Sequence, residues 1–159
     1  RITDLIERYA ATGTLFLFRN RGRAELRGVE VETQAMLPRG FALEATAEAS
    51  RGRDAVDATP LDDVAPAAGS VALRHAVSAR VASYVRIKTV GSHSAAGPSE
   101  VPTRSHTIAD AGVHWNLARH LALSGVVRNF LNRAYESSAG PRWVWAPGRQ
   151  GSVTIVVAY

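Results

Sequence analysis

The sequence predicts an all-β protein, an antiparallel transmembrane β-barrel segment of about eight strands. First, apolar and polar residues alternate with a period of two along most of the chain. Second, the links between the alternating segments are short and long in turn, which is typical of outer-membrane barrels. Third, no run of 18 or more apolar residues is present, so a transmembrane helix is not available.

The segment 150–159 is the clearest strand. Val153, Ile155, Val157 and Tyr159 fall on one face, because successive side chains of a strand point to opposite sides. The same criterion, applied along the chain, predicts strands at 1–9, 14–37, 41–51, 68–76, 80–90, 106–116, 120–131 and 150–159.

The second of these strands is too long for an ordinary globular sheet. We expect either a bulge near residues 20–22 or a continuation as a ribbon above the membrane. Residues 38–40, 77–79 and 117–119 are expected to form tight turns. The long polar links are 51–67, 91–105 and 135–147.

The polar faces leave a soluble antiparallel sandwich open as an alternative, because their charges suit bulk solvent as well as a wet lumen. These charged residues are Glu30, Glu32, Glu44, Glu48, Arg86 and Lys88. In favour of the membrane barrel, the apolar face continues to the final residue, which is aromatic.

Composition excludes several other classes. The chain has no Cys, so disulfide frameworks and thiolate metal sites are ruled out. The net charge is +5, but no cluster of five basic residues occurs and aromatics do not interleave with Arg, so we expect no nucleic-acid partner. The chain opens at Arg1 in the middle of a pattern, and we expect it to be a piece of a longer protein.

Five motifs occur in a fixed order. They are NRGRAELRGVEVE at 20–32, PLDDVAP at 60–66, VRNFLNRAY at 127–135, Pro-Gly-Arg at 147–149, and the terminal aromatic Tyr159. Together they resemble the C-terminal barrel region of TonB-dependent outer-membrane receptors over nearly the whole chain. Within these motifs the matching residues are Asn20, Gly28, Glu30, Asn129, Tyr135, Gly148, Arg149 and Tyr159.

The resemblance implies that residues 1–159 are one part of a larger, 22-stranded barrel whose plug domain lies upstream. It implies a receptor in the bacterial outer membrane that imports a scarce nutrient, foremost a ferric siderophore, with haem, vitamin B12 and glycans as other ligands. The implied partners are TonB, reached through the N-terminal region, the barrel-assembly machinery and outer-membrane lipid. No cofactor is implied, and the receptor is not an enzyme. Ser70 and Ser124 have no base at motif spacing, which also argues against a hydrolase.

Ligand contacts are expected in the outer loops. Long-range attraction of an anionic chelate is one role for Arg51, Arg53, Arg104 and Arg142. His93 and His106 flank a loop and are haem ligands in one interpretation, although ordinary polar positions are favoured. Trp143 and Trp145 belong to an aromatic girdle or contact ligand. The loop carboxylates Asp54, Asp57, Asp62 and Asp63 are expected to be solvated rather than to bind calcium.

Two alternatives remain open at this point. One is a complete small eight-stranded outer-membrane barrel with a structural or adhesive role. The other is a soluble β-sandwich binding module.

Overall fold

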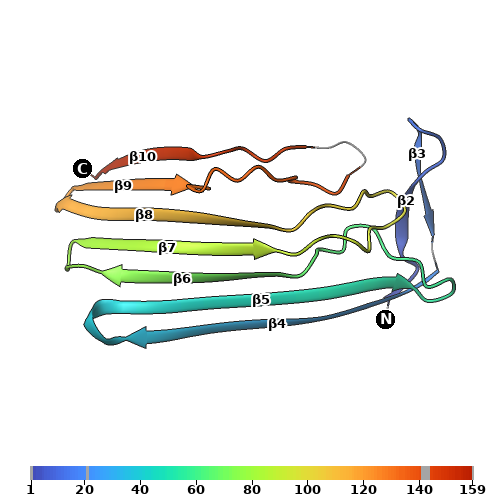
Figure 1. Cartoon of the computed structure of the whole chain (residues 1–159), viewed down its shortest axis with the longest axis horizontal. Helices are drawn as coiled ribbons and strands as arrows, with labels where there is room; N and C mark the ends of the chain where they lie inside the picture. The colour runs from blue at the N-terminus through green and yellow to red at the C-terminus, as the bar shows by residue number, and fades with distance from the viewer. Residues whose placement is uncertain (1, 21, 141–143, 159) are drawn as a thin grey trace.

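The computed structural model describes residues 2–20, 22–140 and 144–158, and it shows one layer of antiparallel strands (Figure 1). Eight strands form a single sheet in the order β1-β4-β5-β6-β7-β8-β9-β10, and β2 and β3 form a separate hairpin. Among the described residues, no helix is long and apolar enough to cross a membrane. The elements are β1 (Ile2–Thr3), β2 (Ile6–Ala10), β3 (Phe16–Asn20), β4 (Arg23–Leu37), η1 (Pro38–Gly40), β5 (Phe41–Asp54), β6 (Ala68–Ala76), β7 (Val81–Val90), β8 (His106–Ala118), β9 (Leu121–Arg128) and β10 (Gln150–Val157).

Short turns lie at one end of the sheet and long links at the other, as the sequence predicts (Figure 1). The turn after β4 is η1, in which Arg39 and Gly40 have φ values of 62° and 78°. A Cβ on Gly40 would lie 2.8 Å from the carbonyl oxygen of Ala76, so both the backbone conformation and the available space require glycine. The long links, 55–67, 91–105 and 129–149, gather at the opposite end with the β2–β3 hairpin.

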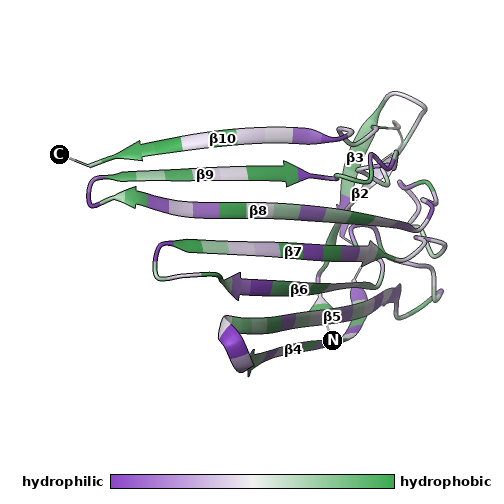
Figure 2. Ribbon diagram, turned by 60° about the vertical axis from the view of Figure 1, so that its left-hand side comes forward, coloured by the Kyte–Doolittle hydropathy of each residue, from purple (hydrophilic) through white to green (hydrophobic). Residues whose placement is uncertain are grey.

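The cross-strand register separates two faces of the sheet. Leu43, Leu73, Val85, Ala111 and Val127 are successive partners across five strands and form an apolar row. One residue further along, the row contains Glu44, Ala72, Arg86 and Asp110, as the alternating colours along the strands in Figure 2 show. We call the face of the odd-numbered residues the apolar face and that of the even-numbered residues the polar face.

Cross-strand pairs organise the polar face. Arg74 Nε lies 2.6 Å from Glu44 Oε1, and its guanidinium lies 5.7 Å from the centre of the Tyr84 ring. Tyr84 in turn covers Gly112, where a Cβ would collide with the ring. Contacts of this kind between directly or diagonally opposed side chains hold neighbouring strands in register.

Both faces of the sheet are largely uncovered. The buried apolar residues are few and mostly small: Ala24, Ala42, Leu61, Ala72 and Ala109. No side chain of the described residues is large and fully buried. A β-sandwich would bury one face of each sheet against a second sheet, so the soluble sandwich alternative is wrong.

The N-terminal expectations need correction. The predicted strand 1–9 is divided, because Asp4 adopts a φ of 58° and the chain leaves the sheet after β1. The predicted strand 14–37 is interrupted between β3 and β4, and β3 pairs with β2 beyond the outer end of the sheet. Of the two expectations for this strand, the ribbon is therefore the correct one.

The remaining strand boundaries agree with the prediction to within three residues. The sheet is open, because β1 and β10 are its two edges and do not pair with each other. The alternative of a complete, closed eight-stranded barrel is therefore wrong for this chain.

Candidate functional site

The site of interest is the cluster of the three long links at the outer end of the sheet. These links fold over the polar face: Ser50, a polar-face residue, donates a hydrogen bond to the carbonyl oxygen of Ala65 at 3.3 Å. Leu61 is buried and lies over Gly52, where an added Cβ would be 3.0 Å from Leu61 Cδ1. The first link is thus anchored to β5 by a small apolar contact as well as by hydrogen bonds.

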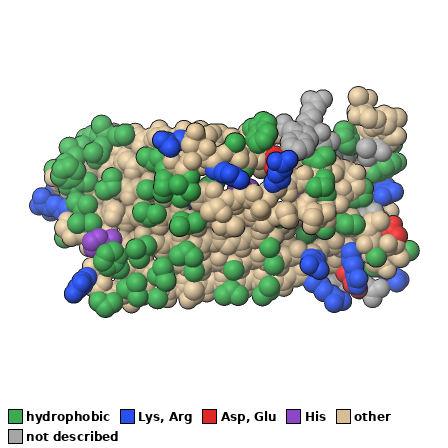
Figure 3. Space-filling view, viewed as in Figure 1, with side chains coloured by type: hydrophobic (Ala, Val, Ile, Leu, Met, Phe, Trp, Pro, Cys, Tyr) green, Lys and Arg blue, Asp and Glu red, His purple; other side chains and the backbone are tan. Residues whose placement is uncertain are grey.

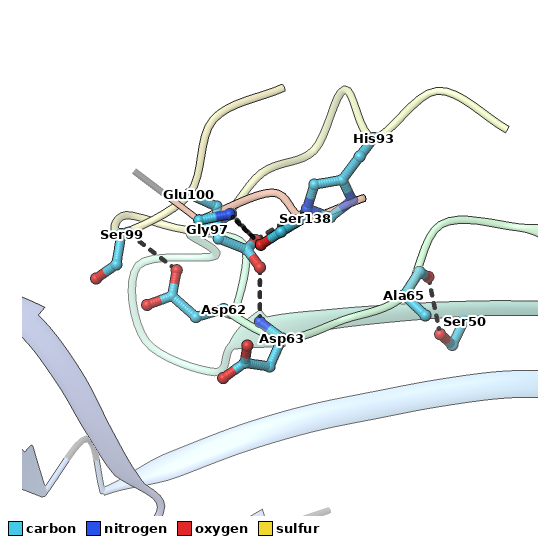
Figure 4. A network of polar contacts seen from close by, with 10 residues as sticks. Ser50, Asp62, Asp63, Ala65, His93, Gly97, Ser99, Glu100 and Ser138 are labelled. Atoms are coloured by element: carbon cyan, nitrogen blue, oxygen red, sulfur yellow. Dashed lines mark hydrogen bonds and ion pairs between the residues drawn. The ribbon is translucent and has the colours of Figure 1, made fainter. Parts of the chain in front are cut away.

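Glu100 joins the first and second links (Figure 4). Its Oε1 accepts a hydrogen bond from the backbone N–H of Asp63 at 3.0 Å. Its Oε2 accepts one from the N–H of Gly97 at 2.8 Å and lies 2.9 Å from Nε2 of His93. The side chains of His93 and Glu100 are only 6% and 10% exposed, so these polar groups are satisfied inside the cluster.

The electrostatics of Glu100 follow from these contacts. Burial on its own would raise the pKa of the carboxyl, but the hydrogen bonds from His93, Gly97 and Asp63 stabilise the charged form and lower the pKa below its ordinary value of 4.5. The carboxylate is therefore ionised at neutral pH and remains the acceptor at the centre of the cluster.

A second contact joins the same two links. The backbone N–H of Ser99 donates to Asp62 Oδ1 at 2.9 Å, and Gly97 lies so close to Asp62 that no side chain would fit there. The third link is attached by two backbone donors: Val101 N–H bonds the carbonyl oxygen of Ala139 at 2.7 Å, and Arg104 N–H bonds Glu136 Oε2 at 3.3 Å. The three links form one connected platform.

Asn129 closes the base of the third link. It is 4% exposed and has a φ of 48°, a conformation that Asn tolerates better than most residues. Its side-chain amide donates to the carbonyl oxygens of Arg133 at 2.8 Å and Pro147 at 3.4 Å, and its Oδ1 accepts from Arg133 N–H at 2.9 Å. The side chain therefore bridges the two ends of a link that runs from β9 to β10.

Asn132 adds a second closure. Its φ is 53°, and its Oδ1 accepts a hydrogen bond from the N–H of Arg149 at 2.9 Å. A Cβ on Gly148 would lie 2.8 Å from the same oxygen, so a side chain at that position would displace the Asn132 amide. The motifs at 127–135 and 147–149 are thus two halves of one contact, which places the first residue of β10.

Asp110 connects this closure to the sheet wall. Its Oδ1 accepts from the backbone N–H of Asn129 at 2.9 Å, and its Oδ2 lies 3.4 Å from Arg86 on the neighbouring strand. Nearby, the rings of His106 and Tyr135 stack with their centres 4.1 Å apart. Tyr135, a motif residue, therefore packs the third link onto the outer end of β8.

The other motif residues also have clear local contacts. Asn20 accepts a hydrogen bond from Gly22 N–H at 2.7 Å and donates to Asp4 at 3.3 Å, which fixes the corner before β4. Gly28 allows close approach of β5, because a Cβ would lie 3.0 Å from the carbonyl oxygen of Ala49. Glu30 lies on the polar face, directly opposite Glu48.

The predicted ligand residues do not converge on one point. His93 is buried against Glu100 rather than presented to a ligand. Arg53 belongs to β5 rather than to a loop, and its guanidinium pairs with Glu25 at 3.0 Å on the apolar face. Arg104 lies in the second link and is exposed. Arg142, Trp143 and Tyr159 lie outside the described residues.

The predicted loop carboxylates act as acceptors within the loops. Asp54 is 4% exposed and accepts a hydrogen bond from Val56 N–H at 2.6 Å, so the expectation that it is solvated is wrong. Asp57 accepts from Thr59 N–H at 2.9 Å. Within the described ranges, no three His, Asp or Glu side chains are arranged to hold a metal ion.

Two central residues, Glu100 and Asp110, were not among the sequence-based candidates. Their partners are distant in sequence: Asp63 is 37 residues from Glu100, and Asn129 is 19 residues from Asp110. Only the position of Asp110 on the polar side of an alternating strand was visible in the sequence.

Comparison with known proteins gives the context for this wall and its platform. The family described as "TonB dependent receptor-like, beta-barrel" matches residues 1–130. The chain belongs to the TonB-dependent receptor family. No curated protein matches the sequence. The family is one of transport receptors, and its members lie in the outer membrane of Gram-negative bacteria.

Solved structures agree in fold. Copper transporter OprC is 15% identical with a TM-score of 0.85, over 98% of this chain and 27% of that chain. The ferric yersiniabactin uptake receptor FyuA from Yersinia pestis is 18% identical with a TM-score of 0.73, over 89% of this chain and 24% of its own. The ferric enterobactin receptor PfeA from Pseudomonas aeruginosa is 12% identical with a TM-score of 0.77, over 99% and 27%. The chain spans about a quarter of the length of these receptors.

Membership of this family indicates what surrounds each face of the sheet. Lipid-facing and lumen-facing residues alternate along the strands of an outer-membrane barrel. The apolar face of the receptor wall is therefore the membrane face, and the polar face lines the lumen. The long links lie at the extracellular end and the short turns at the periplasmic end.

Proposed function

We propose that the intact receptor imports a ferric siderophore across the outer membrane, energised by TonB, and that residues 1–159 form the C-terminal part of its barrel wall. The observation that carries this proposal is the family match over residues 1–130. The strand register supports it, because it places apolar residues on the membrane face and charged residues on the lumen face. TonB acts on the intact receptor through its N-terminal region.

The names of similar receptors support iron as the cargo metal. They include uptake receptors for ferric yersiniabactin and ferric enterobactin and a ferric-catecholate import receptor. The three long links, joined by hydrogen bonds into one platform at the outer end of the sheet, suit a receptor that must bind its cargo outside the cell. Exposed Arg104 and the chain's net charge of +5 favour an anionic chelate.

Uptake of radioactive iron tests the proposal directly. Cells that lack the receptor and cells that express it would be supplied with single, defined ferric siderophores under iron limitation. We expect uptake only with the receptor, and loss of uptake when TonB is deleted. Receptor-dependent uptake that persists without TonB would contradict the energy coupling, and a lack of uptake with every chelate class would contradict the cargo.

Copper is the second candidate cargo, because Copper transporter OprC superposes with a TM-score of 0.85. Copper(I) prefers thiolate and thioether ligands. This chain contains no Cys and one Met, Met36, which lies on β4 near the periplasmic turn, far from the platform. The same uptake assay with labelled copper distinguishes the two: receptor-dependent copper uptake would replace iron as the cargo.

A further inference from the structure

The membrane-facing side chains of β4 and β5 change from mainly apolar to charged at one point along the strands, just above the Val29–Ala49 pair. From Val29 and its partner Ala49 toward the periplasmic turn, the odd-numbered side chains are uncharged and almost all apolar. Immediately above this pair, Arg27 lies opposite Arg51, and above them Glu25 lies opposite Arg53. Arg23 continues the row at the start of β4. We call Arg23, Arg27, Arg51 and Arg53, with Glu25, the outer basic cluster.

The height of this cluster matches the membrane boundary. From Val29 to Leu37 the chain makes eight steps, which at about 3.3 Å each span roughly 26 Å along the strand. A tilt of about 40° reduces this to roughly 20 Å along the membrane normal, close to the apolar band of about 25 Å seen in outer-membrane barrels. The arginines therefore lie at the level of the outer-leaflet headgroups.

The cluster carries excess positive charge. Four arginines against one glutamate leave a net charge of +3. Glu25 is shared, since its Oε2 lies 3.0 Å from Arg53 and 3.4 Å from Arg27. Arg27 and Arg51 are direct cross-strand partners, and like charges in this arrangement repel. Among the described residues, Arg23 and Arg51 have no acidic partner within ion-pair distance.

The strands next to β5 do not continue this row of arginines. The outermost membrane-face residues of β6, β7 and β8 are Gly69, Thr89 and Thr107, which lie level with Ala47 of β5, below the arginines. The hydroxyls of Thr89 and Thr107 lie 3.0 Å apart and hydrogen-bond with each other. In Figure 3, a group of Lys and Arg side chains lies over the outer ends of β4 and β5, beside a surface of hydrophobic side chains, and other basic side chains are spread over the upper part of the view. The position is on the side away from the lumen, so passing cargo does not meet it.

We propose that the outer basic cluster binds a phosphate group of an outer-leaflet lipid, a phosphorylated glycolipid whose acyl chains lie against the apolar band below. Guanidinium groups bind phosphate oxygens through paired, charge-assisted hydrogen bonds. A phosphate between Arg27 and Arg51 would also neutralise their mutual repulsion. Basic residues next to a membrane apolar segment attract anionic lipid headgroups in the same way.

The test uses the intact receptor in detergent with two lipid probes, bisphosphorylated lipid A and the same lipid without phosphates, and native mass spectrometry to count bound lipid. We expect preferential binding of the phosphorylated form. In R27Q/R51Q, the loss of two basic contacts should weaken that binding about 30-fold. R27K/R51K keeps the positive charges but not the paired hydrogen bonds, so it should weaken binding less than R27Q/R51Q does. The matched control is R39Q/R80Q, which removes two exposed arginines at the periplasmic turns and should leave binding unchanged.

Each contrary result would overturn the proposal. Equal binding of the two lipids would show that phosphate is not recognised. Unchanged binding in R27Q/R51Q would place the lipid elsewhere, and an equal loss in R39Q/R80Q would indicate a general charge effect. Competition by inorganic phosphate at concentrations similar to those of the lipid would identify a soluble anion, not a membrane lipid, as the ligand. None of these results depends on the cargo of the receptor.

Discussion

Asn129 offers the sharpest test of how the last strand is positioned. Its side chain makes two short hydrogen bonds with Arg133 and a longer one with Pro147. Each net hydrogen bond contributes about 1 kcal/mol, and a left-handed backbone at a residue without a suitable side chain costs about 1 kcal/mol more. The two short hydrogen bonds and the backbone preference together predict that replacing Asn129 by Ala destabilises the contact between the two ends of the third link by about 3 kcal/mol.

Hydrogen exchange of the intact receptor measures this closure locally. A loss of about 3 kcal/mol corresponds to an increase of more than a hundredfold in the opening equilibrium. We expect this increase at the amide of Arg133, which donates to Asn129, and at the amide of Arg149, which donates to Asn132 in the same link. The isosteric Asn129→Asp should be at least as damaging, because a carboxylate would face the carbonyl oxygens of Arg133 and Pro147.

Asn116→Ala is the control for this experiment, since Asn116 is exposed and its side chain hydrogen-bonds with His114, away from the third link. It should change exchange at the closure by less than a factor of about three, as expected for a remote surface site. Exchange in Asn129→Asp equal to that of the wild type would refute the reasoning, because it would show that the amide donor is not needed.

Three further predictions concern the assignment of the two faces, the titration of Glu100 and the stability of residues 1–159 alone. Val31→Arg, on the membrane face between the middle and the outer edge of the apolar band, should cost about 1–2 kcal/mol and reduce the heat-resistant folded fraction in gel electrophoresis, whereas Glu32→Arg on the lumen face should not; equal effects would invalidate the assignment of faces. The lowered pKa of Glu100 means that its contribution is complete above pH 4.5 and is lost as the pH falls through the lower folded value. Exchange at Asp63 and Gly97, corrected for intrinsic rates, should therefore rise on acidification, and Glu100→Gln should remove this dependence; a pH-independent wild type would contradict it. Residues 1–159 alone, reconstituted in lipid, should not form a stable folded barrel, and recovery of one by circular dichroism and protease resistance would overturn this expectation.

The strands and their faces could be predicted because they depend on a local pattern. Alternation along β10, for example in Val153 and Ile155, is independent of what the neighbouring strand contains. The turn at Pro38–Gly40 was equally visible, since Pro and Gly mark such conformations directly. These features needed no knowledge of distant residues.

The cluster of links could not be predicted in the same way. Glu100 receives hydrogen bonds from Asp63 and His93, and nothing in the sequence states that residues 63 and 100 meet. The path of an irregular link depends on which donors it finds after the strands have assembled. His93 was visible as a histidine beside a loop, and an ordinary polar position was favoured over a ligand role, but its partner Glu100 could not be identified from spacing.

The division of the N-terminal segments has a different cause. The alternation continues from Phe16 through Leu37, and a period-two pattern alone does not mark a break. The break depends on Asn20 and Asp4, whose side chains and backbone hold the corner at Gly22. Small polar residues and glycine favour such corners, and these residues lie where the sequence led us to expect a bulge, although the chain makes a corner there instead.

The alternation of apolar and polar residues does not predict how many strands are needed to close the barrel. Only one side of β10 is paired, so about half of the backbone polar groups in its eight residues lack a partner within this sheet. In hydrocarbon each such group costs several kcal/mol, and the sum, of order 20 kcal/mol, exceeds the net stability of about 5–15 kcal/mol of a typical domain. The sheet therefore requires further strands on this edge in the membrane, and β4 has the same requirement beyond its short pairing with β1. Alternation specifies which side chains face lipid, but strand number follows from tilt and stagger around the whole barrel. Eight-stranded and larger barrels therefore show the same alternation in sequence. In this structure they are distinguished by the two edge strands, which do not pair with each other.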